Sequence, residues 1–415
     1  MVGSMGETEL AAIGIASQIF FVHWMLMFGF TSGSATFMAQ FWGANDVKNI
    51  RKTTGFAISV CLFISSFIFA FAYFFPRGVM SVFTDFSAVI DLGEGYVQVV
   101  AFTLILISIT VPITGALRAT HQTHIPLFIS LFVFSTNTFL NYVLIFGKFG
   151  APQMGVTGAG VATLIARLLE LTLILVFVFA RGNVVSGKFR DYFGWSREFA
   201  RRLLRNAIPT TVNETMWGLG TALYVAAYAR MGVTQFAAVQ ASNTINQVFI
   251  MVAFSMGDAT LILVGQKIGE GKLDYSYYLA KKLLQIGTGI GIALGLLLIL
   301  LARPLISLFG FTPEGEGYAM IILIIYGSVM GLQLYTGMNI VGTLRAGGDT
   351  KFAMLTECGS IWLVGVPIAF AGALYFQFPV YVVVALVKLE EVVKFFILRK
   401  RFKSRKWAKN VINNL

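Results

Sequence analysis

The chain of 415 residues is too apolar for a water-soluble protein. Hydrophobic residues make up 57% of it and charged residues only 12%, whereas about a quarter of the residues in a soluble domain are charged. The composition therefore excludes an ordinary soluble protein and predicts a chain that lies largely within a membrane.

Apolar segments long enough to cross a bilayer as helices, about 20 residues each, recur along the whole chain. A membrane β-barrel would instead show alternating stretches of about ten residues. We therefore predict an all-α polytopic membrane protein with eleven spans, at residues 11–40, 54–75, 96–114, 125–146, 156–179, 207–231, 237–264, 283–302, 318–341, 352–376 and 379–398.

The basic residues predict the orientation of these spans. Most of the 31 Lys and Arg residues fall in every second loop and in the C-terminal tail, and basic residues are retained on the cytoplasmic side. We expect the N-terminus outside and the C-terminus inside, in the inner (plasma) membrane of the cell. The net charge of +12 is spread over these loops without an RNA-binding signature, which favours membrane lipids and no nucleic acid as partners.

The sequence contains an internal repeat at a nearly constant spacing. Two landmarks of the first half recur in the second: Gly33-x-Ala35-Thr36 with Gln40-x-x-Gly43 as Gly257-x-Ala259-Thr260 with Gln266-x-x-Gly269, and Gly115-x-Leu117-Arg118-Ala119 as Gly342-x-Leu344-Arg345-Ala346. Six predicted spans separate equivalent landmarks, so the repeats are parallel and predict two bundles around a central cavity.

We predict an N-terminal lobe at 1–180, a cytoplasmic linker at 181–205, a C-terminal lobe at 206–398 and a basic cytoplasmic tail at 399–415. The first-half counterpart of span 207–231 would lie before Met1. The N-terminal lobe is therefore expected to contain five spans and to lack its first helix.

Several segments together resemble the multidrug and toxic compound extrusion (MATE) family: GETELAAIGIA, GSATFMAQFWGAND, GALRAT, FLNYVLIFG with Asn141, MGVTGAGVATLIAR and GTLRAGGDT. The resemblance implies twelve helices in two lobes and a cation-coupled exporter of organic cations, with MVGSMGE as the tail of the first helix. Sodium-coupled members pair a Glu at the position of Glu214 with an Asp in the tenth family helix, but residues 318–341 contain no carboxylate. The coupling ion, proton or sodium, therefore stays open.

Glu214 lies about two turns into span 207–231, where an ionised carboxylate is costly and is by default a functional group. At helical spacing it shares a face with Trp217, Tyr224 and Tyr228. A carboxylate with aromatic rings suits a lipophilic cation, since each cation–ring contact contributes about 0.5 to 2 kcal/mol. Alternatively, the acid is neutralised by neighbouring helices and the rings only pack. The adjacent Asn213 is either an oxygen ligand or a packing residue.

A second polar face on the next span predicts part of the same cavity, through Asn243, Gln247 and Asp258. Asp258 either binds substrate or cation or stays hydrated near the cytoplasmic side. Asn141 is expected to line the cavity from the first half, and Glu357 is interpreted as structural.

Other charged residues predict local ion pairs, namely Arg167 with Glu170, Glu390 with Lys394, and Arg345 with Asp349. We expect Lys388 to extend along the apolar face. No histidine has a second ligand at metal spacing, so no metal site is predicted. No Walker motif or nucleophile triad is present, which leaves ATP-driven transport and hydrolysis without support.

Our hypothesis is a secondary antiporter that exports small organic cations against protons or sodium by rocking of two lobes. We expect a monomer, no enzymatic activity and no cofactor besides the coupling ion. One alternative is a flippase for lipid-linked oligosaccharides of the same superfamily, whose cavity would need Arg or Lys for phosphate. Another is a truncated membrane protein that transports nothing.

Overall fold

The computed structural model describes residues 6–180 and 182–413, and these residues form helices and no strand. This confirms the predicted all-α polytopic fold. Of the segment MVGSMGE, predicted as the tail of a preceding helix, MVGSM lies outside the described residues, and Glu7 is already the first residue of α1.

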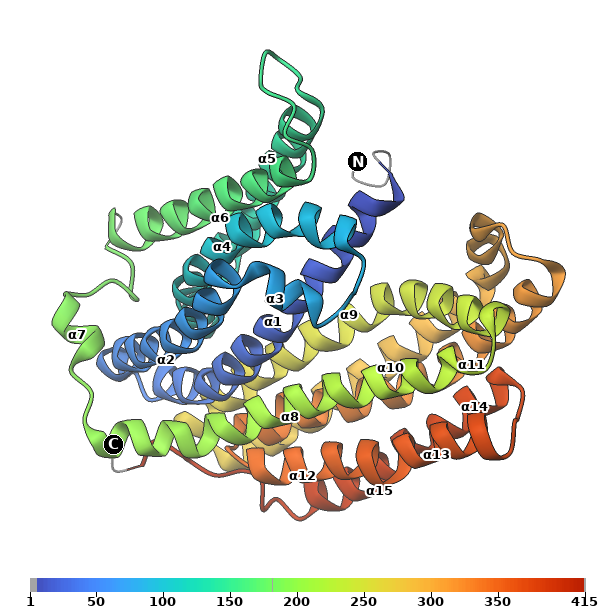
Figure 1. The fold of residues 1–415 in the computed structure, drawn as a ribbon. Helices are drawn as coiled ribbons and strands as arrows, with labels where there is room; N and C mark the ends of the chain where they lie inside the picture. Colours follow the sequence, from blue (N-terminus) through green and yellow to red (C-terminus); the bar gives the residue numbers. More distant parts are fainter. Residues whose placement is uncertain (1–5, 181, 414–415) are drawn as a thin grey trace. The chain divides into compact units, whose positions relative to one another are not determined.

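Two compact units divide the chain (Figure 1). The first unit runs to Ser34 and resumes over Asp46–Arg201, and the second contains Ala35–Asn45 and Arg202–Leu415. The predicted lobes differ from these two units at two points. The end of the first helix, residues 35–45, packs in the second unit, and the predicted tail is partly helical, with Trp407 fully buried.

The first unit is a helix bundle with a core of small and branched apolar side chains. α4 packs along α2 and α6, and α5 packs along α6, as Figure 1 shows. Its elements are α1 (Glu7–Gly43, up to Ser34), α2 (Val47–Phe74), α3 (Pro76–Ser81), α4 (Ser87–Ala119), α5 (His124–Phe146), α6 (Gly155–Ala180) and α7 (Phe189–Phe193).

The second unit has more interrupted helices. π-helical segments at Met338–Leu344, Ile361–Gly365 and Ala371–Tyr375 continue or separate its α-helices, and a 3-10 turn follows α10 at Ser307–Phe309. The α-helices are α8 (Arg197–Ala229), α9 (Val233–Gly269), α10 (Leu273–Ile306), α11 (Pro313–Gly337), α12 (Thr350–Ser360), α13 (Val366–Phe370), α14 (Val380–Val387) and α15 (Leu389–Lys403).

Helical segments cover all eleven predicted spans, but only nine helices of the described residues are both long and apolar enough to cross a membrane. The other two predicted spans, 207–231 and 379–398, correspond to α8 and to α14 with α15. The first contains Asn213 and Glu214, and the second is broken near Lys388 and contains Glu390, Glu391 and Lys394. The polar residues that lower the hydropathy of these segments are those of the site described below.

Large apolar side chains point outward from the helices of both units. Phe63, Phe134, Leu300 and Leu363 are each mostly exposed. Apolar surface of this kind is unfavourable in water but matches the acyl chains of a bilayer. Exposed apolar side chains of this kind are what a membrane-embedded protein is expected to present to lipid.

The first repeat landmark forms a reciprocal contact within the second unit. A Cβ added at Gly43 would collide with the backbone carbonyl of Gln266, and one added at Gly269 would collide with the carbonyl of Gln40. The two Gln-x-x-Gly motifs therefore cross with their backbones in contact, and each glycine is required by the other motif. Repetition of the sequence here produces a locally symmetric contact.

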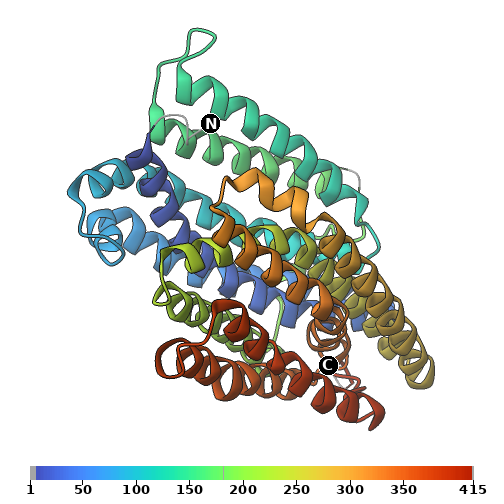
Figure 2. The same ribbon diagram turned by 90° about the vertical axis from the view of Figure 1, so that its right-hand side faces the viewer.

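Small residues also bring α10 against α11, neighbouring helices in Figures 1 and 2. Gly291 and Gly295 face Gly327 and Gly331, with the backbones so close that a Cβ on any of the four would meet the opposite helix. Such close approach is a main source of helix association in membranes, where lipid provides no hydrophobic drive between helices.

We predict that Gly295→Ala lowers the free energy of unfolding by about 1 to 3 kcal/mol, because its Cβ would collide with the Gly327 carbonyl. Gly289→Ala on the same helix is the control, since a Cβ there points into open space and alanine has the higher helix propensity. Thermal unfolding in detergent measures both. Equal melting temperatures for the two variants would show that the glycine contact does not hold these helices together.

Candidate functional site

Glu214 forms a buried ion pair with Arg345 in the second unit. Glu214 is 6% exposed and Arg345 is fully buried. Arg345 is the residue directly after the π-helical segment Met338–Leu344 and is part of the second Leu-Arg-Ala landmark. The costly carboxylate in α8 is therefore neutralised by an arginine that is distant in sequence.

Residues at the end of α1 hold the backbone around this arginine. The Thr36 hydroxyl donates to the Arg345 carbonyl at 2.8 Å, and the Gln40 amide donates to the Ala346 carbonyl at 2.8 Å. The landmark that contains Thr36 and Gln40 thus holds the backbone of the second Leu-Arg-Ala landmark in place. This explains why residues 35–45 belong to the second unit.

The predicted pair of Arg345 with Asp349 is wrong. Asp349 instead pairs with Arg401 at 2.6 Å and with Lys409 at 3.5 Å. Asp349 precedes α12 at the position of its N-cap, where it faces the end of α15, while Arg345 extends toward α8. Sequence proximity suggested the wrong partner for both groups.

Asn213, beside Glu214, donates from Nδ2 to Glu357 Oε2 at 2.6 Å. Glu357 lies on α12 and was interpreted as structural. The amide therefore links the acid-bearing turn of α8 to a second carboxylate, so Asn213 does more than fill space.

A third group of charges lies on α15. Lys394 Nζ is 2.6 Å from Glu391 Oε1 and 3.7 Å from Glu390 Oε1. Thr336 donates to Glu391 at 2.6 Å, and the Tyr224 hydroxyl donates to Glu390. The predicted Glu390–Lys394 pair is therefore the longer contact of a buried triad. Lys388 lies over the ring of Tyr326 at 5.0 Å.

These charges meet at one pocket of the second unit, which we call the charged pocket, with a volume of about 100 Å³. Three carboxylates and one ammonium group line it, from Glu214, Glu357, Glu391 and Lys394. Trp217 and Phe254 line it as well, with ring centroids 6.0 Å apart and an edge-to-face arrangement. The predicted Glu214 and Trp217 thus share one pocket, together with two acids that sequence reasoning did not assign to it.

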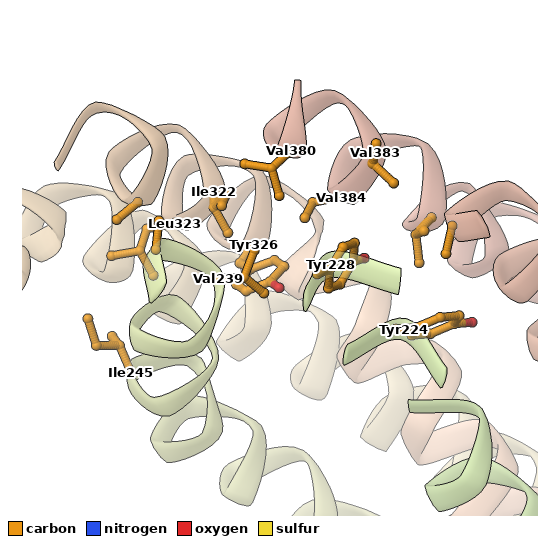
Figure 3. Close-up of a cluster of buried hydrophobic side chains, with 14 of the residues drawn as sticks. Tyr224, Tyr228, Val239, Ile245, Ile322, Leu323, Tyr326, Val380, Val383 and Val384 are labelled. Atoms are coloured by element: carbon orange, nitrogen blue, oxygen red, sulfur yellow. The ribbon is translucent and has the colours of Figure 1, made fainter. Parts of the chain in front are cut away.

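Tyr224 and Tyr228 do not line the charged pocket, contrary to the prediction. Both are buried in the hydrophobic cluster drawn in Figure 3, which also contains Tyr326, Val380 and Val384. Their helical spacing does place them on the face of Glu214, but farther along α8, beside α14. Gly365 leaves room there, since a Cβ at this position would collide with the Tyr224 hydroxyl.

The remaining predicted residues of α9 are dispersed. The Tyr326 hydroxyl donates to Asn243 at 2.8 Å, Gln247 is exposed, and Asp258 is half-buried outside the lining of the charged pocket. Along a helix of this length, residues on one face lie at different depths. The structure therefore does not bring this polar stripe to one point.

Asn141 lines a separate pocket within the first unit, with a volume of about 380 Å³. It donates to Asn137 at 3.0 Å, and Tyr96, Phe134 and Thr163 also line the pocket. Its lining combines polar, aromatic and aliphatic side chains, the last from Ile13, Ile145 and Ala159, and carries no charged side chain. Elsewhere in this unit Arg167 contacts Glu170 at 2.6 Å, the local pair expected from their spacing.

Sequence reasoning missed the roles of Glu357, Glu391 and Lys394. All three are ionisable residues in predicted spans, the signal that singled out Glu214. Glu357 and Lys394 were instead assigned to the nearest local role. Treating every ionisable residue in a span as a candidate would have found the charged pocket.

Comparison with known proteins gives a consistent set of similarities. The MatE family model matches residues 1–143 and 207–371. The chain is 25% identical over 412 residues to the uncharacterized transporter YisQ of Bacillus subtilis, covering 98% of this chain and 89% of YisQ. It is 24% identical over 379 residues to a probable multidrug resistance protein NorM of Thermotoga maritima, covering 90% and 80%.

Solved structures share the fold. A MOP superfamily transporter from Pyrococcus furiosus, described by a binding pocket of reverse polarity, superposes with a TM-score of 0.88 at 18% identity. An outward-facing multidrug resistance transporter of the MATE family superposes with a TM-score of 0.88 at 19% identity. Each alignment covers 98% of this chain and 90% of the other.

We predict that Arg345→Met lowers the free energy of unfolding by about 3 to 5 kcal/mol, because it leaves the Glu214 carboxylate buried without a counter-charge. Adding Glu214→Gln in the same chain should recover most of this loss. Arg167→Met is the control, since Arg167 is 42% exposed and its pair with Glu170 is worth less than about 1 kcal/mol. Chemical unfolding in detergent checks the series, and additive losses in the double variant would contradict the pair.

Proposed function

Because the chain belongs to the MatE family of multidrug and toxic compound extrusion transporters, we propose that it exports small organic cations in exchange for protons or sodium ions. It is a multi-pass membrane transporter and not an enzyme. The finer proposal concerns the charge of the substrate, which we infer from the charged pocket, and the direction of the exchange, which we infer from the distribution of basic residues.

The charge of the charged pocket is the observation that carries the proposal. Carboxylates outnumber the single ammonium group in its lining, and Arg345 lies behind Glu214 as its counter-charge. Even with this arginine counted, the acidic groups exceed the basic groups by one, so the fully ionised pocket carries a net negative charge. In a medium of low dielectric constant such an excess attracts a cation strongly.

The aromatic rings favour an organic cation over a simple ion. Trp217 and Phe254 present an edge-to-face pair at the same pocket as Glu214 and Glu357. Ring faces provide both apolar contact and attraction for an alkylated ammonium or a delocalised cation. The carboxylates supply charge, and the rings supply selectivity for lipophilic substrates.

The volumes of the pockets support a cycle of alternating states. About 100 Å³ is smaller than the roughly 300 to 1,000 Å³ of a typical small-molecule site, so the charged pocket must open to admit a drug. The pocket around Asn141, at about 380 Å³, already falls within that range. We propose that rocking of two lobes exchanges open and closed forms of these sites.

A flippase for lipid-linked oligosaccharides receives less support. Such a substrate carries phosphate and needs an excess of Arg or Lys around it. Here Arg345 and Lys394 are each paired with carboxylates, and Lys388 lies against Tyr326. The described charges therefore favour a cationic substrate.

The proposed orientation follows the distribution of basic residues, with the C-terminus in the cytoplasm of a bacterial-type inner membrane. We propose a monomer in contact with anionic lipids. Export then runs from the side of the basic loops outward, driven by the inward gradient of the coupling ion.

We predict that Glu214→Gln reduces ion-driven efflux of ethidium at least ten-fold. The change removes a negative charge from the charged pocket and leaves Arg345 uncompensated. Efflux is followed by fluorescence in membrane vesicles after a proton gradient or a sodium gradient is imposed.

Glu270→Gln is the matched control. Glu270 follows α9, pairs with Lys267 and Lys272 at 2.6 and 2.8 Å, and lies outside the charged pocket. Hydrogen bonds from these two lysines lower the pKa of Glu270, so this change also removes one negative charge. Normal efflux by Glu214→Gln, at protein levels equal to the control, would overturn the assignment of the site.

A further inference from the structure

The carboxylates of the charged pocket differ in the partners that the structure gives them. Glu214 has the guanidinium of Arg345, and Glu391 has the ammonium of Lys394 at 2.6 Å. The hydrogen bond of Glu357 comes from an amide, Asn213, at 2.6 Å. Glu391 also accepts from the hydroxyl of Thr336, but of the three acids in the lining Glu357 is the one whose contact here is with a neutral donor and not with a cation.

We propose that Glu357 gains and loses a proton during transport. We also propose that the ammonium group of Lys394 is a resident cation, which occupies the oxygen atoms that a sodium ion would need as ligands. Both statements rest on the proposed function and deepen it, since they select the proton as the coupling ion. Neither involves the pair of Glu214 with Arg345, which stays neutral throughout.

Asn213 is suited to serve both protonation states of Glu357. It is 1% exposed, and its Oδ1 atom has no hydrogen-bond partner among the described residues, while Nδ2 donates to Glu357. An ionised carboxylate needs a donor, whereas a protonated one carries an O–H that needs an acceptor. Rotation of the amide by half a turn would supply that acceptor from Oδ1. The unpartnered oxygen is therefore accounted for by a second state of Glu357.

The surroundings of Glu357 leave one proton to exchange. The charged groups facing it are Glu214 from α8, Arg345 after the π-helical segment, and Glu391 and Lys394 from α15, with Cys358 next to it on its own helix. Arg345 and Lys394 balance Glu214 and Glu391. Glu357 is then the acid in excess, since Glu390 beyond it is offset by Lys388.

Lys394 makes the oxygen atoms of this cluster poorly suited to bind a sodium ion. Sodium is a hard cation that requires several oxygen atoms, and the nearest carboxylates, Glu390 and Glu391, already surround the Lys394 ammonium at 3.7 and 2.6 Å. The hydroxyl of Thr336 is also committed to Glu391. A sodium ion would have to displace a covalently attached cation or lie next to it, with repulsion between like charges.

The proposed step exchanges one proton for one organic cation and needs no other reactant. When an organic cation enters the opened pocket, the Glu357 carboxyl group loses its proton to pocket water, and the resulting carboxylate balances the charge of the cation. When the cation leaves, Glu357 takes a proton from water on the other side. The pocket has room for several water molecules next to Glu357, and these can accept and supply the proton.

The test measures proton release and binding in one sample. Ethidium is added to purified full-length protein in detergent, a pH dye in weakly buffered solution reports released protons, and fluorescence anisotropy reports bound ethidium. We expect wild type and Glu270→Gln to release protons on binding. Glu357→Gln should lose at least nine-tenths of this release, and Glu357→Asp, which keeps a carboxyl group, should restore it.

Two outcomes separate this inference from the proposed function. If wild type binds no ethidium, the proposed function is wrong. If Glu357→Gln binds ethidium and still releases protons as wild type does, the role of Glu357 is overturned while the function stands.

A sodium titration tests the role of Lys394. At constant ionic strength, replacing KCl by NaCl should leave ethidium affinity of the wild type unchanged within two-fold, while Lys394→Gln should become sensitive to sodium. Displacement of ethidium from the wild type by sodium but not by potassium would overturn the resident-cation assignment.

Discussion

A charge inside a membrane protein must be matched within the protein, and the second unit is organised by this constraint. Glu214 is buried, and its counter-charge is the fully buried guanidinium of Arg345. Arginine suits this place because it stays protonated at any physiological pH and has several donors in a fixed plane. Removing either partner would leave a bare charge where hydration is weak.

The position of Arg345 explains other features of the fold. Thr36 and Gln40 bond to the backbone around it, so the end of α1 packs with the second unit. The two Gln-x-x-Gly motifs cross at contact distance nearby. The two Gln-x-x-Gly motifs and the second Leu-Arg-Ala motif thus act together as a support for one buried charge.

The same constraint explains which spans are least apolar. α8 contains Glu214, and α15 contains Glu390, Glu391 and Lys394, and these helices do not meet the standard of length and hydropathy that the other nine satisfy. Their charges are tolerated because they face one another and the hydroxyl groups of Tyr224 and Thr336. Low hydropathy here marks the helices that carry acidic and basic side chains of the charged pocket.

The sequence predicted the helices, the repeat and the importance of Glu214, since these depend on local composition and on motifs. It did not predict the partner of Glu214, because Arg345 is remote in the chain and Asp349 lies closer to it in sequence. Tyr224 shares the helical face of Glu214 but is ten residues away, about 15 Å along the axis at 1.5 Å per residue. Periodicity identifies a face and not a depth, so the tyrosines were placed in the pocket in error.

The central claim, that Arg345 is the counter-charge of Glu214 within the membrane domain, is tested most directly by infrared spectroscopy of the purified protein. Subtracting the spectrum of Glu214→Gln from that of wild type at neutral pH isolates the signal of this side chain. The account predicts a carboxylate band for Glu214 in wild type. Subtracting the spectrum of the double variant from that of Arg345→Met should show this band shifted, because the guanidinium no longer donates to Glu214. A protonated carboxyl band for Glu214 in wild type would contradict it.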